Sequence, residues 1–514
     1  HNGEYYFISG EISPGKRTPY IQKGTISGMP KMNLADYSVL IGYLILMVVI
    51  GIAVAGKQST TEDYFKGGQK IPGWAAGLSI YGTQLSAITF MSIPAKTYAS
   101  NWNYFILQMT IIMVMPFVAS FFIPFYRKLN ITTAYEILEK RFNYLTRSLA
   151  SLLFILLQLG RLGIVLLLPA LALAIVTGLA VQWSILLMGI ITIFYTILGG
   201  IKAVIWTDVV QVIILLGGAL LCAALMLANL NMNPLELVQS AKDLNKLELF
   251  NFSLSLESPT FWVVIIGGLA INIISYGTDQ TVVQRYLTTK NVETAKKSLQ
   301  LGAWMVLPSS IVFFSLGTLM FFYFSTFPEK INPEIDRQDA IFPFFIATTL
   351  PHGLIGLLIA AIFSAAMSTL SSSINSLTTT LTNDFVVRLF PQKKDHYYLI
   401  LAKWMTFIIG TIGIGIALYM AESEIYSLWD QFNTILGLFT GGLGGLFILA
   451  LFIKKATSTG VLIGLFGSGL VQLYIKEYTD INFLLYAFTG LISCVIFGYI
   501  FSLMFSTKKI IGHE

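Results

Sequence analysis

Residues 71–100 read IPGWAAGLSIYGTQLSAITFMSIPAKTYAS, and this stretch decides the class of fold. It is long enough to cross a hydrocarbon core about 30 Å thick. Its centre, however, holds small or polar residues where a membrane helix usually carries large aliphatics: Gly77, Ser79, Gly82, Thr83, Gln84, Ser86 and Thr89. Such residues hold a helix weakly, and unwound backbone is tolerated at membrane depth only where it lines a cavity. The stretch therefore predicts either a membrane helix broken at a binding site or a helix packed closely through small residues.

The composition of the whole chain supports a membrane protein. Of 514 residues, 55% are apolar and 11% are charged, whereas soluble domains have about 25% charged residues. A water-soluble enzyme is excluded on this ground, and the cysteines, Cys222 and Cys494, lie inside apolar runs, where they predict no disulfide framework. The expected fold is an all-α polytopic membrane protein with about thirteen transmembrane helices. We place them at 34–56, 72–98, 102–125, 149–176, 184–200, 204–228, 261–284, 302–325, 342–381, 398–420, 427–452, 457–475 and 482–505.

The loops between these segments give an orientation. One set of loops holds twenty Lys and Arg residues, and the opposite set, with the N-terminal tail, holds nine. The excess of positive charge marks the cytoplasmic side, so we expect the N-terminus outside and the C-terminus in the cytoplasm. In this count Arg285 is a cytoplasmic loop residue, and Asp279 close to it is a boundary residue. The segment 342–381 is too long for one span, and its part before Pro351 predicts a separate helix or turn.

A short motif occurs twice with opposite membrane orientation. Tyr81-Gly82-Thr83-Gln84 recurs as Tyr276-Gly277-Thr278-Asp279-Gln280, and five predicted spans lie between the starts of the two spans that hold it. An odd number of spans inverts the second copy. Inverted repeats with broken first helices are a common way to build a binding site at the membrane midplane.

The ninth segment contains a stripe of hydroxyl groups. Residues 360–384 read AAIFSAAMSTLSSSINSLTTTLTND, in which Ser368, Ser371 and Ser372 fall on one helical face. Hydroxyl and carbonyl oxygens are neutral hard ligands that suit a weakly held monovalent cation, and Asp208 on another helix would neutralise its charge. The alternatives are that the hydroxyls bond to carbonyls of their own helix and that Asp208 is a cap or bonds to a loop.

Arg161 lies in the middle of a span, in FILLQLGRLGIVLLL. Its fork of donors suits a carboxylate, and a mid-span arginine requires an anionic partner. That partner is either Asp208 or a bound substrate. Ser86 and Thr89 are three residues apart and share a helical face, and Gln108 in the third span would add an amide contact.

These residues lie in stretches that resemble the sodium/solute symporter family, and most closely its bacterial sialic acid transporters. The stretches are DYFKGGQKIPGWAAGLSIYGTQLSAITFMSIPAKTY, ILGGIKAVIWTDVVQ, DQTVVQRYLTT and LIAAIFSAAMSTLSSSINSL. The resemblance implies a LeuT-like five-helix inverted repeat with broken first helices. The leading helix would be 34–56, the repeats 72–228 and 261–452, and the trailing helices and cytoplasmic tail 457–514.

The resemblance also implies site residues. One sodium site would use backbone oxygens of Gly82, Leu85 and Ala365 with the hydroxyls of Ser368 and Thr369. A second sodium site would use Ser368, Ser371, Ser372 and Asp208. Arg161 would pair with the substrate carboxylate, while Ser86, Thr89 and Gln108 would bind its hydroxyls, amide or glycerol tail. Gln84 departs from the small hydroxyl residue expected there and would reshape the pocket.

The implied activity is sodium-coupled import of sialic acid across a bacterial cytoplasmic (inner) membrane by alternating access, with two sodium ions and no enzymatic step. The alternatives are a sodium symporter for another carboxylated or small organic solute, and a transporter-like sensor. Residues 1–33 predict a polar extracytoplasmic tail. Within it, residues 10–18, GEISPGKRT, resemble the closing repeat of kelch-type sialic acid mutarotases, so the tail would be a remnant of a fused domain, a tag, or a disordered segment.

Overall fold

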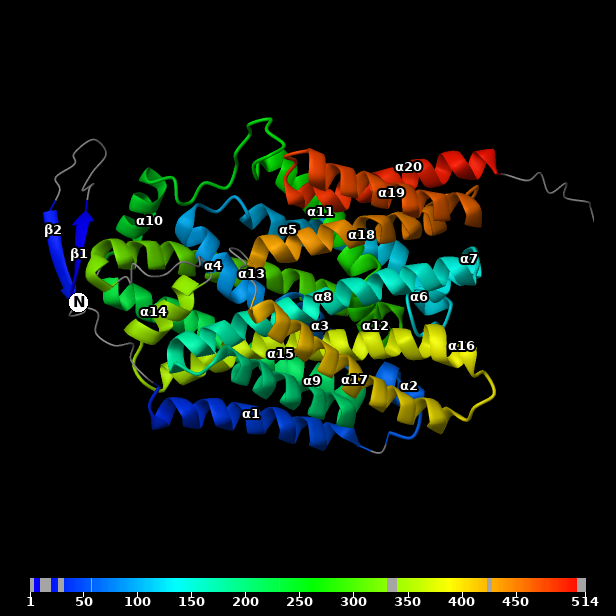
Figure 1. Cartoon of the computed structure of the whole chain (residues 1–514), viewed down its shortest axis with the longest axis horizontal. Coiled ribbons are helices and arrows are strands. Elements are labelled where there is room, and N and C mark those ends of the chain that lie inside the picture. Colours follow the sequence, from blue (N-terminus) through cyan, green and yellow to red (C-terminus); the bar gives the residue numbers. More distant parts are fainter. Residues whose placement is uncertain are drawn as a thin grey trace, which may run out of the picture.

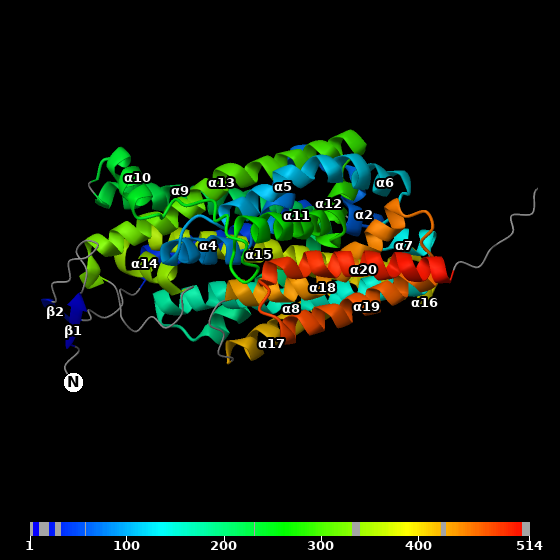
Figure 2. The same cartoon turned by 90° about the horizontal axis from the view of Figure 1, so that it is seen from above.

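The protein is an elongated bundle of helices that run along one common axis (Figure 1). The structure is a computed structural model, and it describes residues 4–9, 20–25, 32–56, 58–230, 232–330, 340–422 and 428–505. The view turned by 90° shows the same helices again running along that axis (Figure 2). In both views α10 and α14 lie at one end of the bundle and α2, α7 and α16 at the other.

The N-terminal tail contains the only strands among the described residues. β1 (Glu4–Ser9) and β2 (Tyr20–Thr25) form an antiparallel hairpin, in which Glu4 pairs with Thr25. The hairpin lies at the end of the bundle that carries α10 and α14 (Figure 1). Residues 10–18, which resemble a kelch repeat, lie outside the described residues.

The helices follow the predicted segments closely. The first ten are α1 (Leu34–Ala55), α2 (Thr61–Lys66), α3 (Gly73–Gln84), α4 (Ala87–Ala99), α5 (Phe105–Phe117), α6 (Ile123–Lys128), α7 (Glu136–Arg141), α8 (Tyr144–Thr177), α9 (Val181–Leu230) and α10 (Pro234–Asp243). The others are α11 (Phe261–Gly277), α12 (Gln280–Thr288), α13 (Val292–Thr326), α14 (Ile341–Thr349), α15 (Leu354–Thr380), α16 (Val387–Leu389), α17 (Asp395–Ala421), α18 (Leu428–Phe452), α19 (Ser458–Tyr478) and α20 (Tyr486–Met504).

The number of membrane spans depends on how broken helices are counted. Among the described residues, nine helices are long and apolar enough to cross a membrane, or ten if the bent pair α11 and α12 is one span. Each of the thirteen predicted segments overlaps a helix, but the count of thirteen stays a prediction. The expectation for 342–381 is confirmed, because the short helix α14 ends at Thr349 and α15 begins after Pro351.

Helix α9 covers two predicted segments, 184–200 and 204–228, because it continues through a kink at Gly200. Gly200 has φ 51° and ψ −146°, a backbone conformation that is almost exclusive to glycine. A β-carbon there would also lie 2.6 Å from the backbone oxygen of Tyr64. Glycine is therefore required at this position by both conformation and close packing.

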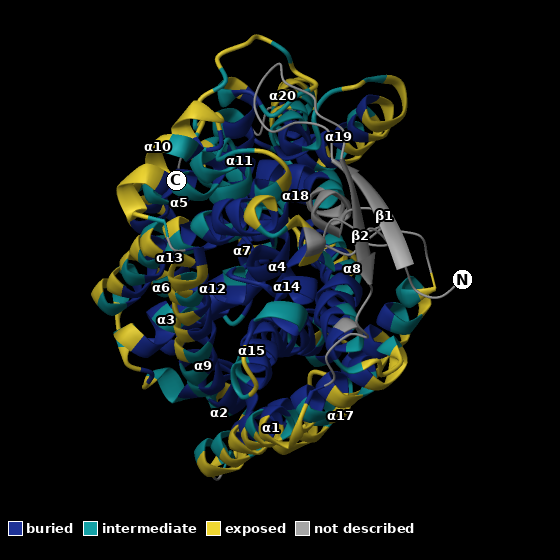
Figure 3. Ribbon diagram, turned by 90° about the vertical axis from the view of Figure 1, so that its left-hand side faces the viewer, coloured by how far each residue is buried: buried dark blue, intermediate teal, exposed yellow. Residues whose placement is uncertain are grey.

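The helix that carries the stripe of hydroxyl groups, α15, lies at the centre of the bundle. Figure 3 shows α15 buried inside, whereas α1 and α17 lie at the periphery with exposed residues on their outer faces. Exposed side chains on α1 include Ile41, Ile45 and Val49, which suit contact with lipid. The hydroxyl groups of α15 are buried and must be satisfied by neighbouring helices or by their own backbone.

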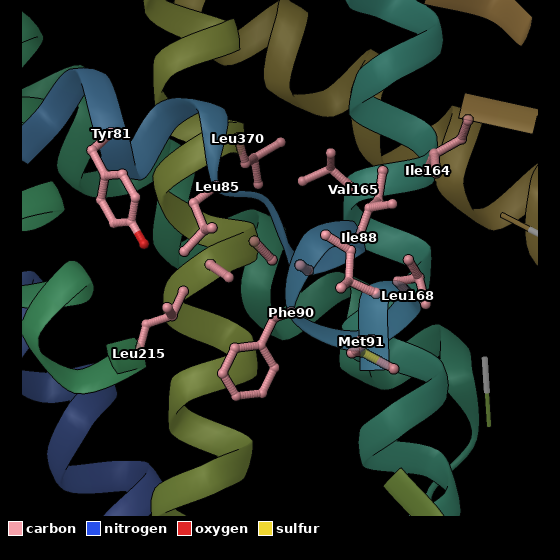
Figure 4. Close-up of a cluster of buried hydrophobic side chains, with 14 of the residues drawn as sticks. Tyr81, Leu85, Ile88, Phe90, Met91, Ile164, Val165, Leu168, Leu215 and Leu370 are labelled. Carbon is pink, nitrogen blue, oxygen red and sulfur yellow. The ribbon is translucent and has the colours of Figure 1, made fainter. Parts of the chain in front are cut away.

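The stretch that decided the fold is a broken helix. The helix α3 ends at Gln84, Leu85 and Ser86 are non-helical, and α4 begins at Ala87. Figure 4 shows apolar packing around this break, with Leu85 beside Leu370 of α15 and Ile88 facing Val165 of α8. A second break separates α11 from α12, which are bent by 47°.

The alternative interpretation of residues 71–100, close helix packing, holds for the first half of the same stretch. A β-carbon on Gly77 would lie 2.8 Å from the backbone oxygen of Ser298 in α13. The small residues before the break thus bring α3 against α13.

Candidate functional site

A cavity next to the two helix breaks gathers all five side chains that the sequence singled out for substrate binding. These are Gln84, Ser86, Thr89, Gln108 and Arg161. The cavity has an empty volume of about 800 Å³, part of it open to solvent. Its remaining lining residues are Ile88, Leu107, Leu157, Gln158, Ile271, Asn272, Ser275 and Asp279. The break in α3–α4 and helices α5, α8 and α11 therefore converge on one site, although the role of each residue in it stays a prediction.

Arg161 enters this cavity from α8 and is buried, with 6% of its surface exposed. One terminal nitrogen donates to the backbone oxygen of Thr83, at 3.1 Å, near the end of α3. The other lies 3.9 Å from a carboxylate oxygen of Asp279. The acidic partner of Arg161 within the protein is thus Asp279 and not Asp208, the residue considered from the sequence.

Asp279 is not a boundary residue, as the sequence suggested, but lies at the break before α12. Its Oδ1 accepts hydrogen bonds from the backbone N–H and the hydroxyl of Thr281, at 2.8 and 2.7 Å. Gln158 donates to the same carboxylate, at 3.3 Å to Oδ2, and is itself held by the hydroxyl of Ser373. The carboxylate therefore caps α12 with one oxygen and lines the cavity.

The repeated motif contained a signal, not used in the sequence analysis, that Asp279 lies at the site. In the two copies, Asp279 occupies the position of Gln84, and both residues line the cavity. The prediction that Asp279 is a boundary residue was wrong, because it rested only on the short distance along the chain between Asp279 and Arg285. The break between α11 and α12 instead places it inside the bundle, where Arg161 and Thr281 compensate its charge.

A second polar cluster surrounds Asp208, which is fully buried in α9. Ser368 of α15 donates to its Oδ1 at 2.6 Å, and Ser79 of α3 donates to its Oδ2. A guanidinium nitrogen of Arg285 lies 3.0 Å from the same Oδ2. Asp208 thus joins α3, α9, α12 and α15, and the interpretation of it as a simple cap or loop contact is wrong.

The position of Arg285 differs most clearly from the prediction. Arg285 was expected in a cytoplasmic loop, but its side chain in α12 is fully buried. Its Nε donates to the hydroxyl of Ser79 at 2.7 Å, and a terminal nitrogen donates to the hydroxyl of Ser372. A count of charges along the chain assigns an arginine at the end of an apolar segment to a loop. The acid that makes its burial tolerable is on another helix, 77 residues away.

The hydroxyl groups of α15 divide into two kinds. Ser368 and Ser372 bond to Asp208 and Arg285, and Ser372 also lies 3.0 Å from the hydroxyl of Thr83. Ser371 donates to the backbone oxygen of Ser368 at 3.1 Å, as in the alternative interpretation of the stripe. The hydroxyls on this face of α15 therefore differ in what they contact.

Comparison with known proteins matches this architecture. The family model described as Sodium:solute symporter family matches residues 64–467. The chain belongs to the sodium:solute symporter family. It is 38% identical to the sodium/sialic acid symporter NanT of Aliivibrio fischeri over 474 residues, covering 92% of this chain and 94% of that protein. It is also 38% identical to the sodium/sialic acid symporter SiaT of Proteus mirabilis over 480 residues, covering 92% and 96%.

A solved structure of the family has the same fold. It is a Na⁺-coupled sialic acid symporter in a substrate-bound, outward-open state with a novel Na⁺ site, and it superposes with a TM-score of 0.87 at 37% identity. The alignment covers 92% of this chain and 98% of the other. This family member therefore has the expected LeuT-like fold with broken helices, and like its relatives it is a transporter and not an enzyme.

The residues expected at the first sodium site of this symporter lie where α3 approaches α15. A β-carbon on Gly82 would lie 3.2 Å from the hydroxyl of Ser368 and 2.8 Å from Val212. Thr369 donates to the backbone oxygens of Ala365 and Thr83, at 3.2 and 3.3 Å. The break that frees the carbonyl of Leu85 is next to this contact. The donors here are neutral hydroxyl and carbonyl oxygens, which fit a monovalent cargo ion.

A cation of the protein itself, the guanidinium group of Arg285, contacts residues expected at the second sodium site. Asp208 and Ser372 both contact the guanidinium group of Arg285. The expected ligand Ser371 is bonded to its own helix instead. A sodium ion that uses Asp208 in this symporter must therefore share the carboxylate with Arg285 or displace it.

Proposed function

We propose that this member of the family is a sodium-coupled symporter that imports sialic acid by alternating access. The observation that carries the proposal is the single cavity that Arg161 shares with Gln84, Ser86, Thr89 and Gln108. The two sialic acid symporters with 38% identity over nearly their whole length support it.

The chemistry of the cavity fits this substrate. Sialic acids carry a carboxylate, an N-acetyl amide and several hydroxyl groups, and the carboxylate is charged at neutral pH. The guanidinium of Arg161 binds the carboxylate through two parallel hydrogen bonds. Ser86, Thr89 and Gln108 bind hydroxyl, amide or glycerol groups, and the longer side chain of Gln84 sets which variant of the sugar fits.

Sodium ions complete the cavity before the substrate binds. The first ion is held by backbone oxygens of Gly82, Leu85 and Ala365 with the hydroxyls of Ser368 and Thr369. It fixes the break between α3 and α4, to which Ser86 and Thr89 are attached. Since each ligand then favours the same state, sodium and substrate raise each other's affinity by the same factor.

A second ion at Ser368, Ser371, Ser372 and Asp208 makes transport electrogenic. Two sodium ions and one anion carry a net charge of +1 inward. Each elementary charge that crosses gains about 2.3 kcal/mol per 100 mV of membrane potential. Both the sodium gradient and the membrane potential then drive uptake.

In this proposal the protein lies in the bacterial inner membrane with its N-terminus outside and its C-terminus in the cytoplasm. The start of α1 and the end of α20 lie at opposite ends of the bundle, which supports placing them on opposite sides of the membrane (Figure 1), and the count of Lys and Arg in the loops gives the direction. The buried position of Arg285 changes the loop count to nineteen against nine and leaves its sign unchanged. The leading helix is 34–56, the repeats are 72–228 and 261–452, and 457–514 holds the trailing helices.

The test is uptake of labelled N-acetylneuraminate into proteoliposomes, with and without an inward sodium gradient and a potassium diffusion potential. We expect uptake that requires sodium and increases when the interior is negative. Absence of uptake by folded protein would withdraw the sialic acid assignment, and a panel of other carboxylated solutes would then identify the substrate. Sodium-dependent uptake that does not change with the membrane potential would argue for a single sodium ion per substrate, because one sodium ion and one anion carry no net charge.

A further inference from the structure

The cavity contains a negative charge as well as a positive one. The position of the negative charge, on Asp279, indicates a role in selectivity. Asp279 lines the same cavity as Arg161, with 3.9 Å between its Oδ2 and a guanidinium nitrogen. That distance is too long for a hydrogen bond. The two groups neutralise each other's charge across a gap and do not form a closed bidentate pair.

The two oxygens of Asp279 have different surroundings. Oδ1 is occupied, since it accepts two short hydrogen bonds from Thr281. Among the described residues, the contacts of Oδ2 are longer: 3.3 Å to Gln158 and 3.9 Å to Arg161. An ionised carboxylate oxygen accepts about two hydrogen bonds, so Oδ2 retains capacity to accept one from a molecule in the cavity.

The orientation of this carboxylate is fixed from both sides. Thr281 holds Oδ1 through its backbone and hydroxyl groups. The amide nitrogen of Gln158 donates to the same carboxylate, while Ser373 donates to the amide oxygen of Gln158. Capping of α12 requires Oδ1 alone, and Asn or Ser caps a helix about as well as Asp. The helix cap therefore does not account for the second oxygen, Oδ2, which lies 3.9 Å from the guanidinium group of Arg161.

The charge balance limits which anions the cavity accepts. An incoming carboxylate that pairs with Arg161 places two negative charges around one guanidinium in a buried site. Asp279 then loses part of the compensation that Arg161 provides, which is costly unless new donors replace it. A ligand with hydroxyl or amide N–H groups brings such donors, and a simple monocarboxylate does not.

We propose that Asp279 is a specificity-determining residue that accepts a hydrogen bond from a hydroxyl or amide N–H of the bound substrate. It thereby selects carboxylates that carry such donors over carboxylates that lack them. Asn272 and Ser275 lie three residues apart on α11 and line the same cavity, so α11 contributes two further polar side chains to its wall. This inference deepens the proposed function and rests on it only for transport, because selectivity is measurable as binding.

The experiment compares four probes on the purified protein in lipid nanodiscs with sodium. N-acetylneuraminate and gluconate carry hydroxyl groups near a carboxylate, and pyruvate and propionate carry none. We expect the wild type to bind the hydroxylated pair at least about tenfold more tightly. In Asp279→Asn we expect about tenfold weaker binding of that pair, since a charge-assisted hydrogen bond becomes a neutral one. Binding of pyruvate and propionate should be unchanged or tighter.

Two further variants separate selectivity from folding. Asp279→Ser keeps a helix cap without a carboxylate and should reproduce the loss of preference if Asp279→Asn does not fold. Asp384→Asn is the control, because Asp384 is also a buried acid paired with an arginine, Arg147, but does not line the cavity. It should leave the ratio between the two pairs of probes unchanged.

The outcomes distinguish this inference from the proposed function. Weakening of all four probes by the same factor in Asp279→Asn would overturn it, because Asp279 would then act only on Arg161 or on the fold. Equal binding of gluconate and pyruvate by the wild type would also overturn it. A failure to bind or transport N-acetylneuraminate would remove the proposed substrate, and the ratio of gluconate to pyruvate would still decide the role of Asp279.

Discussion

Arg285 and Asp208 form a fully buried ion pair, in which a guanidinium nitrogen lies 3.0 Å from a carboxylate oxygen. The pair connects α12, next to the second helix break, with α9. Ser79 contacts both members, so the first broken helix joins the same cluster. The negative charge of Asp208 is therefore compensated without sodium. Any sodium ion that binds Asp208 must compete with the guanidinium group of Arg285.

The pair should be strongly coupled in stability. Arg285→Gln or Asp208→Asn alone leaves a buried charge without its partner, which costs about 3–5 kcal/mol. The double variant removes both charges and should recover a large part of that loss. Thermal unfolding in detergent of the wild type, both single variants and the double variant measures the coupling. Additive effects would show that the two charges do not depend on each other.

Asp208 should also set the sodium dependence of transport. If it helps to bind a second ion, Asp208→Asn should lower the Hill coefficient for sodium from about two to about one, because a Hill coefficient does not exceed the number of sites. The measurement is initial uptake rate against sodium concentration in proteoliposomes. The double variant with Arg285→Gln is the control for stability. An unchanged Hill coefficient would exclude Asp208 from sodium binding.

Two adjacent serines of α15 provide a matched pair. Ser372→Ala removes the oxygen that accepts from Arg285 and leaves a buried donor unsatisfied, which costs about 1–3 kcal/mol. Ser371→Ala removes a hydroxyl that bonds to the backbone of its own helix, so we expect about 1 kcal/mol or less. Both residues are fully buried, and thermal unfolding compares them directly. A larger loss of stability for Ser371→Ala than for Ser372→Ala would contradict the different contacts of these two hydroxyl groups.

Arg161 should control affinity for carboxylates. Arg161→Ala removes the guanidinium and leaves Asp279 facing the cavity without it, so we expect at least about a hundredfold loss of affinity for N-acetylneuraminate. Arg161→Lys keeps the positive charge but loses the planar pair of guanidinium donors. Its affinity should lie between those of the wild type and Arg161→Ala. Equilibrium binding by the purified proteins is the measurement, with retained sodium binding as evidence of folding. Unchanged affinity would remove Arg161 from the site.

Gly200 should be essential for the kink in α9. Gly200→Ala places a β-carbon 2.6 Å from a backbone oxygen at a conformation that costs about 1–3 kcal/mol for other residues. We expect a clearly lower unfolding temperature and lower yield. Gly217→Ala in the same helix is the control, because no atom lies within 4 Å of its added β-carbon. Equal behaviour of the two variants would argue against the kink.

The sequence predicted those parts of the site whose residues differ from their apolar surroundings. Ser86 and Thr89 are polar residues within a span, and Arg161 is costly wherever it is placed in one, so each indicated a cavity. The structure brings them together with Gln84 and Gln108. The helix break was predictable for the same reason, because small and hydroxylated residues form a weak helix.

The ion pairs were not predictable, because they join residues far apart in the chain. Arg285 is 77 residues from Asp208, and Arg161 pairs with an acid at the break of another helix. Hydropathy reports the cost of burying each charge alone and carries no information on its partner. The thirteen predicted segments each overlap a helix, but 184–200 and 204–228 join as α9 because Gly200 turns the chain without ending the helix.

Gln84 and Asp279 hold the same position in the two copies of a short motif, and both line one cavity. Two identical copies would give that cavity identical walls, suited to a ligand that is the same at both ends. In this chain the copies have diverged, to a neutral amide in one and an acid in the other. A scaffold with approximate twofold symmetry has thereby acquired a binding site with a head and a tail, as a ligand with no symmetry of its own requires.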